Sequence, residues 1–176
     1  RSSAASDVYK RQIQLYSFSK VYRLTGHRVG LMVASKSFIK QVEKFLDTTT
    51  ICPNRLAQKA AYFGLLKLQG FMTKEKLKIK KLKNTFEKEL STNQNWSLLG
   101  IGGYFAYLGY NSNLDSISIA KKLLVDQNIL TIPGDMFFPK SKNLFVKEKR
   151  SIRIAFANST NEEIIDLFKR LKNFSL

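Results

Sequence analysis

The order of apolar and polar residues divides the chain near Gly70. Before it, near-continuous apolar runs predict buried strands at 13–17 and 29–34, as in parallel or mixed sheets that are covered on both faces. Apolar periodicity then predicts helices at 37–46 and from Pro53 to about 68, with the proline in the first turn, where its missing N–H costs nothing. Gly70 is expected to break the chain before the next helix.

After Gly70 the pattern predicts one long helix and then mixed elements. Apolar residues at helical spacing across about 73–90 predict an amphipathic helix with a basic face, in the run TKEKLKIKKLK. Thr160 and Glu163 have the spacing of a capping box and predict the start of a last helix. The other predicted elements, in chain order, are strands at 96–99 and 104–110, a helix at 116–127, a short strand ahead of Pro133 and a strand at 151–157. The predicted fold class is α/β.

The segment 15–30, LYSFSKVYRLTGHRVG, carries the most informative chemistry. Pyridoxal phosphate needs an amine that forms a Schiff base with its aldehyde, and Lys20 is the candidate for that amine. The phosphate of this cofactor calls for hydroxyl donors and for a guanidinium that makes two parallel hydrogen bonds. Ser17, Ser19 and Arg28 fit those roles. The segment therefore predicts a site for pyridoxal phosphate.

The run SFSK at 17–20, followed by an arginine between two nearby glycines, resembles the cofactor-lysine motif of class I/II aminotransferases. These are pyridoxal phosphate enzymes of fold type I. The resemblance implies that Lys20 bonds to the cofactor and that Ser17 and Arg28 hold its phosphate.

Three later segments resemble the same family in the expected order. GGYFAY at 102–107 resembles the glycine–aromatic strand of the family's small domain, and ILTIPGDMF at 129–137 resembles its segment ending in PGxxF. SIRIAFA at 151–157 resembles the strand whose arginine binds the α-carboxylate of the substrate. The resemblance therefore implies that role for Arg153.

The resemblance also implies a domain organisation. Residues 1–12 do not resemble the family, and we interpret them as a non-native leader. The rest is expected to comprise the C-terminal part of the fold type I large domain at 13–72, an interdomain helix at 73–90 and an α+β small domain at 91–176. The family places its glycine-rich phosphate loop and the residues around the pyridine ring ahead of the lysine. We therefore interpret the chain as a C-terminal fragment that binds cofactor weakly and turns over poorly.

The implied function is that of a pyridoxal phosphate-dependent aminotransferase, which transfers an amino group between an amino acid and a 2-oxo acid. Another fold type I enzyme, such as a carbon–sulfur lyase or an acyl transferase, would share Lys20, Arg28 and Arg153. A non-catalytic aminotransferase-like domain that senses a ligand would also be compatible with these residues. The full-length protein is expected to be a cytoplasmic homodimer.

Composition narrows the other possibilities. The formal net charge of +17 is typical of nucleic-acid binders, but the lysines are scattered and no nucleic-acid motif accompanies them, so no nucleic-acid partner is expected. No apolar stretch is long enough to predict a membrane span. Cys52, the single cysteine, excludes an intrachain disulfide and is expected to be buried, and no metal site is expected. His27 is interpreted as structural, or at most as lining the site.

Overall fold

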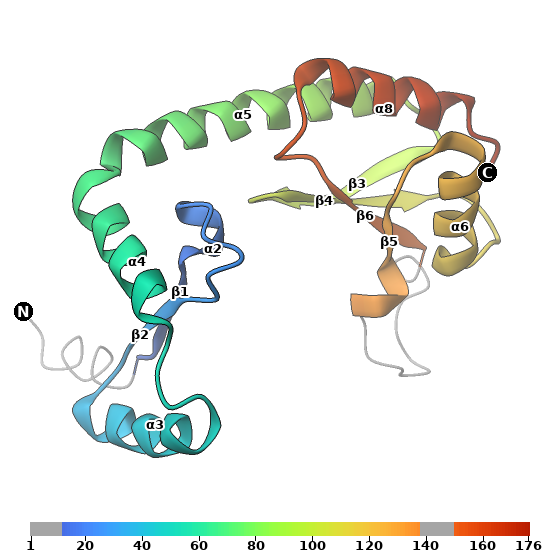
Figure 1. The fold of residues 1–176 in the computed structure, drawn as a ribbon. Helices are drawn as coiled ribbons and strands as arrows, with labels where there is room; N and C mark the ends of the chain where they lie inside the picture. Colours follow the sequence, from blue (N-terminus) through green and yellow to red (C-terminus); the bar gives the residue numbers. More distant parts are fainter. Residues whose placement is uncertain (1–11, 138–149) are drawn as a thin grey trace, which may run out of the picture. The chain divides into compact units, whose positions relative to one another are not determined.

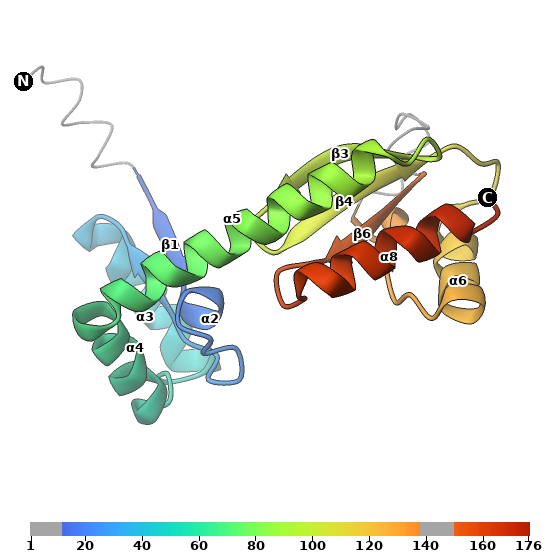
Figure 2. The ribbon, with the colours of Figure 1, turned by 90° about the horizontal axis from the view of Figure 1, so that it is seen from above.

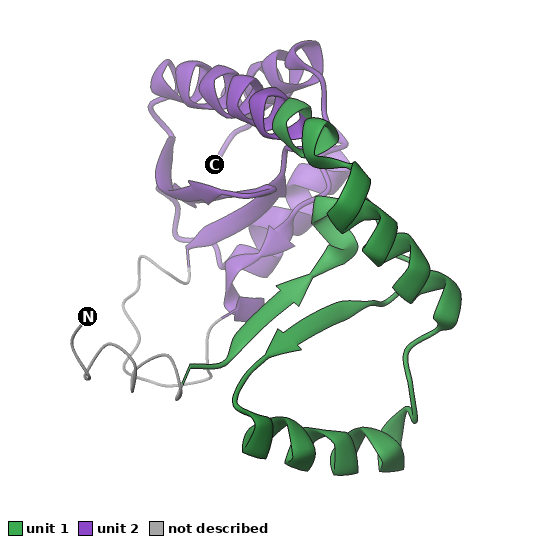
Figure 3. Cartoon of the chain, turned by 90° about the vertical axis from the view of Figure 1, so that its left-hand side faces the viewer, with its two compact units in different colours: residues 1–74 green, residues 75–176 purple. Residues whose placement is uncertain are grey.

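The computed structural model describes residues 12–137 and 150–176. The chain forms two compact units, residues 1–74 and residues 75–176, which Figure 3 shows in different colours. The leader predicted at 1–12 lies almost entirely outside the described residues.

The described residues of the first unit, 12–74, form a two-stranded antiparallel sheet and three helices, followed by the start of another helix, α5 (Figure 1). Tyr16 of the first strand pairs with Leu31 of the second. In chain order the elements are β1 (Gln14–Ser17), α2 (Phe18–Val21), β2 (Gly30–Val33), α3 (Lys36–Thr49), α4 (Arg55–Lys67) and α5 (Gln69–Ser91), which continues into the second unit.

The core of the first unit is small. Its buried side chains are Phe18, Tyr22, Val29, Ala57 and Ala61. The two strands contribute none of these residues, because Leu15 is 71% exposed and Leu31 is 46% exposed. The prediction of buried strands is therefore wrong for this chain: within the described residues β1 and β2 pair only with each other.

Two predicted helix boundaries are also wrong. Asn54, rather than the preceding proline, starts α4, because its side chain accepts hydrogen bonds from the N–H groups of Leu56 and Ala57 at 2.9 and 3.2 Å. The break between α4 and α5 falls at Leu68, and Gly70 lies inside α5. Both glycine and proline mark a break in general, but here an asparagine and a leucine occupy the boundary positions.

The second unit is a four-stranded antiparallel sheet with helices packed on it. The strand order is β3-β4-β6-β5, and Figures 1 and 2 show α8 beside the second half of α5 on one side of the sheet. The elements are β3 (Trp96–Gly102), β4 (Phe105–Tyr110), α6 (Ser116–Gln127), β5 (Ile132–Pro133), the 3₁₀ helix η1 (Gly134–Phe137), β6 (Ser151–Ala155) and α8 (Asn161–Asn173).

Alternation along the strands separates the two faces of this sheet. Ala106 and Leu108 of β4 and Ile152 and Ile154 of β6 are buried and belong to one large cluster. The rings of Phe86 on α5 and Phe168 on α8 meet edge to face in that cluster, with centroids 4.8 Å apart. Along β4 and β6, the residues that alternate with these buried positions therefore face the other side of the sheet.

Two helices begin where the sequence predicts. Asp115 caps α6, because its carboxylate accepts a hydrogen bond from the N–H of Ser118 at 2.9 Å. The capping box predicted for α8 is present: Thr160 Oγ1 accepts from the N–H of Glu163 at 3.2 Å, and Glu163 Oε2 accepts from the N–H of Thr160 at 2.7 Å.

Candidate functional site

Four of the predicted site residues lie on the β1–α2–β2 segment. Ser17 ends β1 and caps α2, with its Oγ accepting from the N–H of Ser19 at 3.3 Å. The N–H of Phe18 donates to the carbonyl oxygen of Val29 at 3.3 Å, which joins the two ends of the connection. The strand, the cap and this backbone bond place Ser17, Ser19 and Lys20 at the start of one short helix.

A stacked pair of rings fixes that helix to the core of the first unit. Phe18 and Tyr22 are four residues apart on one face of α2, and their ring centroids are 5.9 Å apart. Both side chains are buried, whereas Lys20 is exposed. The buried face therefore anchors α2 while Lys20 lies on its solvent side.

Arg28 occupies an unusual backbone position. Its φ is 50°, in the left-handed region that residues with a Cβ seldom adopt. Its Nη1 donates to the carbonyl oxygen of Thr25 at 3.0 Å. Since a guanidinium carries five N–H donors, this bond leaves others for an anion.

The two glycines beside this arginine differ. A Cβ at Gly30 would lie 2.7 Å from the carbonyl oxygen of Tyr16, so the close approach of β2 to β1 requires glycine there. A Cβ at Gly26 would meet nothing within 4 Å. The steric requirement thus applies at only one of the two positions.

The side chains of this segment match the chemistry of a phosphorylated aldehyde. Lys20 offers an amine, Ser17 and Ser19 offer hydroxyls, and Arg28 offers a guanidinium. These groups come from a segment of 12 residues, 17–28, which is closed by the hydrogen bond from the backbone N–H of Phe18 to the carbonyl oxygen of Val29. The donor set present therefore fits pyridoxal phosphate.

Arg153 lies in the second unit, on β6. It pairs with Tyr107 of β4 on one side and with Ile132 of β5 on the other. Its guanidinium carbon lies 4.3 Å from the ring centroid of Phe105 and 4.6 Å from that of Phe137. The side chain is therefore packed against two aromatic rings.

Sequence reasoning missed these aromatic neighbours. Both rings lie in segments that resemble the family, GGYFAY and ILTIPGDMF, but the resemblance assigned them no role. The ring of Tyr107 meets that of Phe137 at an angle of 76°, with centroids 5.6 Å apart. Burial raises the pKa of Tyr107, and the positive charge of Arg153 partly opposes that change.

The remaining candidates are peripheral. Cys52 is exposed, so the prediction of a buried cysteine is wrong; it follows the left-handed residue Ile51 at a turn after α3. His27 lies in the turn before Arg28, where its backbone N–H donates to the carbonyl oxygen of Leu24 at 3.2 Å.

Across residues 12–137 and 150–176 there is no cluster of three or more metal-ligating side chains. None of the helices described there has the length and apolar character to cross a membrane.

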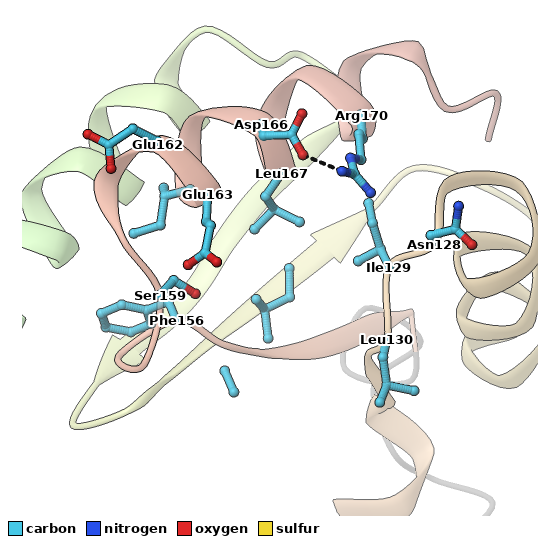
Figure 4. Close-up of a pocket in the computed structure, with 13 residues that line it drawn as sticks. Asn128, Ile129, Leu130, Phe156, Ser159, Glu162, Glu163, Asp166, Leu167 and Arg170 are labelled. Atoms are coloured by element: carbon cyan, nitrogen blue, oxygen red, sulfur yellow. Dashed lines mark ion pairs between the residues drawn. The ribbon is translucent and has the colours of Figure 1, made fainter.

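A cavity of about 500 Å³ in the second unit lies between α8, β6 and the loop at 128–130 (Figure 4). Three of its charged groups already have structural partners. Glu163 belongs to the capping box, and Asp166 forms an ion pair with Arg170, whose Nη1 also donates to the carbonyl oxygen of Gln127 at 3.2 Å. None of the predicted site residues lines this cavity.

Comparison with known proteins gives consistent matches. Residues 3–171 match the family model described as aminotransferase class I and II. The match begins inside the segment 1–12 that we interpreted as a leader. That interpretation stays a prediction.

Two curated relatives illustrate the similarity. The aspartate aminotransferase of Thermotoga maritima is 27% identical over 169 residues, which cover 96% of this chain and 41% of the relative. The histidinol-phosphate aminotransferase of Caldicellulosiruptor saccharolyticus is 30% identical over 131 residues, which cover 74% of this chain and 35% of the relative. The chain thus spans about two fifths of the length of the curated relatives it matches.

Solved structures agree. An aminotransferase from Staphylococcus aureus has a TM-score of 0.78 and 26% identity, covering 92% of this chain and 41% of its own. A Thermus thermophilus aspartate aminotransferase variant has a TM-score of 0.81 and 16% identity, covering 97% of this chain and 45% of its own. The second likeness concerns the fold alone.

Proposed function

The chain belongs to the class I and II aminotransferase family, and on that premise we propose that the intact protein is a pyridoxal phosphate-dependent aminotransferase. It transfers an amino group between an amino acid and a 2-oxo acid. The observation that carries the proposal is the combination of the family match with Ser17, Lys20 and Arg28 on one segment.

The residues of this segment have different roles in holding and using the cofactor. When bound, pyridoxal phosphate supplies an aldehyde that bonds to amines and a ring that withdraws electrons from the substrate's Cα. Lys20 would contribute the amine that holds the aldehyde until the amino group of the substrate takes its place, and the freed Nζ would then move a proton at Cα. Ser17, Ser19 and Arg28 bind the phosphate, and this contact fixes the cofactor relative to the lysine.

Arg153 is assigned to the other reactant. Its guanidinium binds the α-carboxylate of the amino acid or 2-oxo acid through two parallel hydrogen bonds. The support for this role is the match of its strand to the family and its packing against two rings.

The assembly and location belong to the same proposal. The full-length protein acts as a homodimer, as the resemblance to the family implies. It acts in the cytoplasm. This reducing compartment suits a chain whose single cysteine cannot form an intrachain disulfide.

The decisive experiment maps the lysine that reacts with the cofactor. The purified full-length protein is titrated with less than one equivalent of pyridoxal phosphate, reduced with borohydride and analysed by peptide mass mapping. Lys20 is expected to carry most of the label, although the chain has many exposed lysines. Lys44→Ala, which removes an exposed lysine of α3, is the matched control for Lys20→Ala.

Each outcome has a distinct meaning. Labelling that is lost in Lys20→Ala and kept in Lys44→Ala supports the proposal. Labelling spread evenly over the surface lysines would contradict the assignment of Lys20. Product analysis of the full-length enzyme, for a 2-oxo acid rather than pyruvate with ammonia, separates a transaminase from a lyase.

A further inference from the structure

Among the described residues, two aromatic rings and no acidic side chain hold the guanidinium of Arg153. Its guanidinium carbon is 4.3 Å from the centroid of Phe105 and 4.6 Å from that of Phe137, well within the range of a cation–π contact. Within residues 12–137 and 150–176, no carboxylate forms an ion pair or a hydrogen bond with this guanidinium.

Each ring lies on an element that hydrogen bonds tie to a neighbouring element. Phe105 lies on β4, where it pairs with Ala155 and is therefore a diagonal neighbour of Arg153 across the strands. Phe137 ends η1, which is tied to α6 because the N–H of Asp135 donates to Ser116 Oγ at 3.2 Å. Ser116 is fully buried, so this anchor is shielded from water.

A third ring supports Phe137. Tyr107 is the β4 residue directly opposite Arg153, and its ring packs edge-on against Phe137 at 5.6 Å between centroids. The β4 strand thus contributes one ring that contacts the arginine and a second ring that supports the other contact.

Contact with rings and contact with a carboxylate leave the N–H donors of an arginine in different states. A carboxylate beside an arginine holds it by accepting hydrogen bonds from its N–H groups. A substrate carboxylate would then have to displace that partner. A ring face holds the cation through its quadrupole and leaves the N–H donors without a competing acceptor. Since the side chain is already restricted by packing, less rotational freedom is lost when an anion binds.

We propose that Phe105 and Phe137 are positioning residues that hold the guanidinium of Arg153 so that its N–H donors stay available to the carboxylate of the substrate. The inference rests on the proposed function, because it deepens the role given there to Arg153. It also makes lysine a poor replacement for this arginine, since an ammonium lacks the planar fork that stacks and donates at once.

The test follows the Arg153 side chain directly. The Nε–Hε resonance of Arg153 in the ¹⁵N-labelled chain is assigned with Arg153→Leu and titrated with propionate, and then with propionamide, which has the same size and no charge. Phe105→Leu and Phe137→Leu each remove one ring. Phe137→Tyr restores a ring, and Phe71→Leu removes the ring that lies 5.7 Å from Arg23 in the other unit.

We expect propionate, and not propionamide, to shift the resonance in the wild-type chain. Each Phe→Leu change should weaken propionate binding about two- to fivefold, the worth of one exposed cation–π contact. Phe137→Tyr should bind like the wild type, and so should Phe71→Leu. The backbone spectrum reports whether each variant is folded.

Two results would overturn the proposal in different ways. Equal propionate affinity in the folded Phe→Leu variants and the wild type would refute the positioning role and leave Arg153 as the carboxylate ligand. Failure of propionate to shift Arg153 in the wild-type chain would refute both roles. The mapping of Lys20 would then report independently on the cofactor assignment.

Discussion

The ring of Tyr22 packs directly against the backbone of Gly64. A Cβ at position 64 would lie 2.7 Å from Cδ2 of Tyr22, closer than real Cβ contacts come. Tyr22 in turn stacks on Phe18 at the start of α2. The contact therefore links the middle of α4 to the helix that carries Lys20.

Gly64→Ala should therefore destabilise the first unit. Overpacking of this kind costs roughly 1–3 kcal/mol, and the better helix propensity of alanine returns about 0.5–1 kcal/mol. The exchange rates of the α4 amide protons, measured by NMR, should rise about tenfold, which corresponds to about 1.4 kcal/mol.

Gly70→Ala is the matched control for that substitution. A Cβ at Gly70 would meet nothing within 4 Å, and the residue lies in a helix. In Gly70→Ala the exchange rates of the α4 amide protons should therefore fall slightly or stay unchanged. Slower exchange in Gly64→Ala as well would show that Tyr22 moves aside at little cost.

Thr160→Ala should weaken the second unit through the capping box of α8. Loss of a threonine N-cap costs about 1 kcal/mol, because an N–H at the start of the helix loses its acceptor. Trp96, the single tryptophan, is buried and donates from Nε1 to the carbonyl oxygen of Leu171 on α8 at 3.4 Å. Its fluorescence during urea unfolding is therefore a direct reporter.

Ser159→Ala tests whether the effect is specific to the cap. The Ser159 hydroxyl makes no side-chain hydrogen bond in the described part of the chain. The free energy of unfolding should therefore change by less than about 0.5 kcal/mol. A loss as large as that of Thr160→Ala would show that any change in this turn weakens α8.

Tyr110 should ionise at a higher pH than an ordinary tyrosine does. Burial, followed by the negative charges of Asp115 and Asp135, raises its pKa to about 12, with Arg150 opposing the change. The unfolded chain loses this proton near pH 10, so the folded state binds more protons between about pH 10 and 12. The contribution of Tyr110 to stability is thus complete below about pH 10 and declines as the pH rises through about 12.

An ultraviolet pH titration of the folded chain checks this expectation. The titration should contain a step near pH 12, and Tyr110→Phe should remove that step. The substitution should also flatten the alkaline decline of the urea midpoint. A single common transition for all tyrosines in the folded chain would contradict the shift.

Sequence reasoning predicts the elements whose signals are local. Thr160 and Glu163 locate the start of α8, and the helix predicted at 116–127 has the observed bounds. The prediction for α8 depends on two capping side chains that lie within the first turn of the helix. Such short-range hydrogen bonds can form however the rest of the chain packs.

Features that depend on distant residues were less predictable. Burial of Leu15 was predicted from its apolar neighbours, but burial needs a covering element, and the residue is 71% exposed. The contact of Phe137 with Arg153 depends on strand register and on the course of η1, and no spacing in the sequence encodes it. The residues of the candidate cofactor site were predicted because they lie on one short segment; the rings around Arg153 were missed because they do not.

The left-handed backbone at Arg28 sets stability and activity against each other. Glycine adopts such a conformation without the strain of roughly 1 kcal/mol or more that a side chain incurs there, so Arg28→Gly should be neutral or favourable for folding. The same change removes the guanidinium proposed to bind the phosphate. A screen that rewards only thermal stability or expression would therefore tend to discard this arginine, and a library made for engineering should be sorted by cofactor retention before it is sorted by robustness.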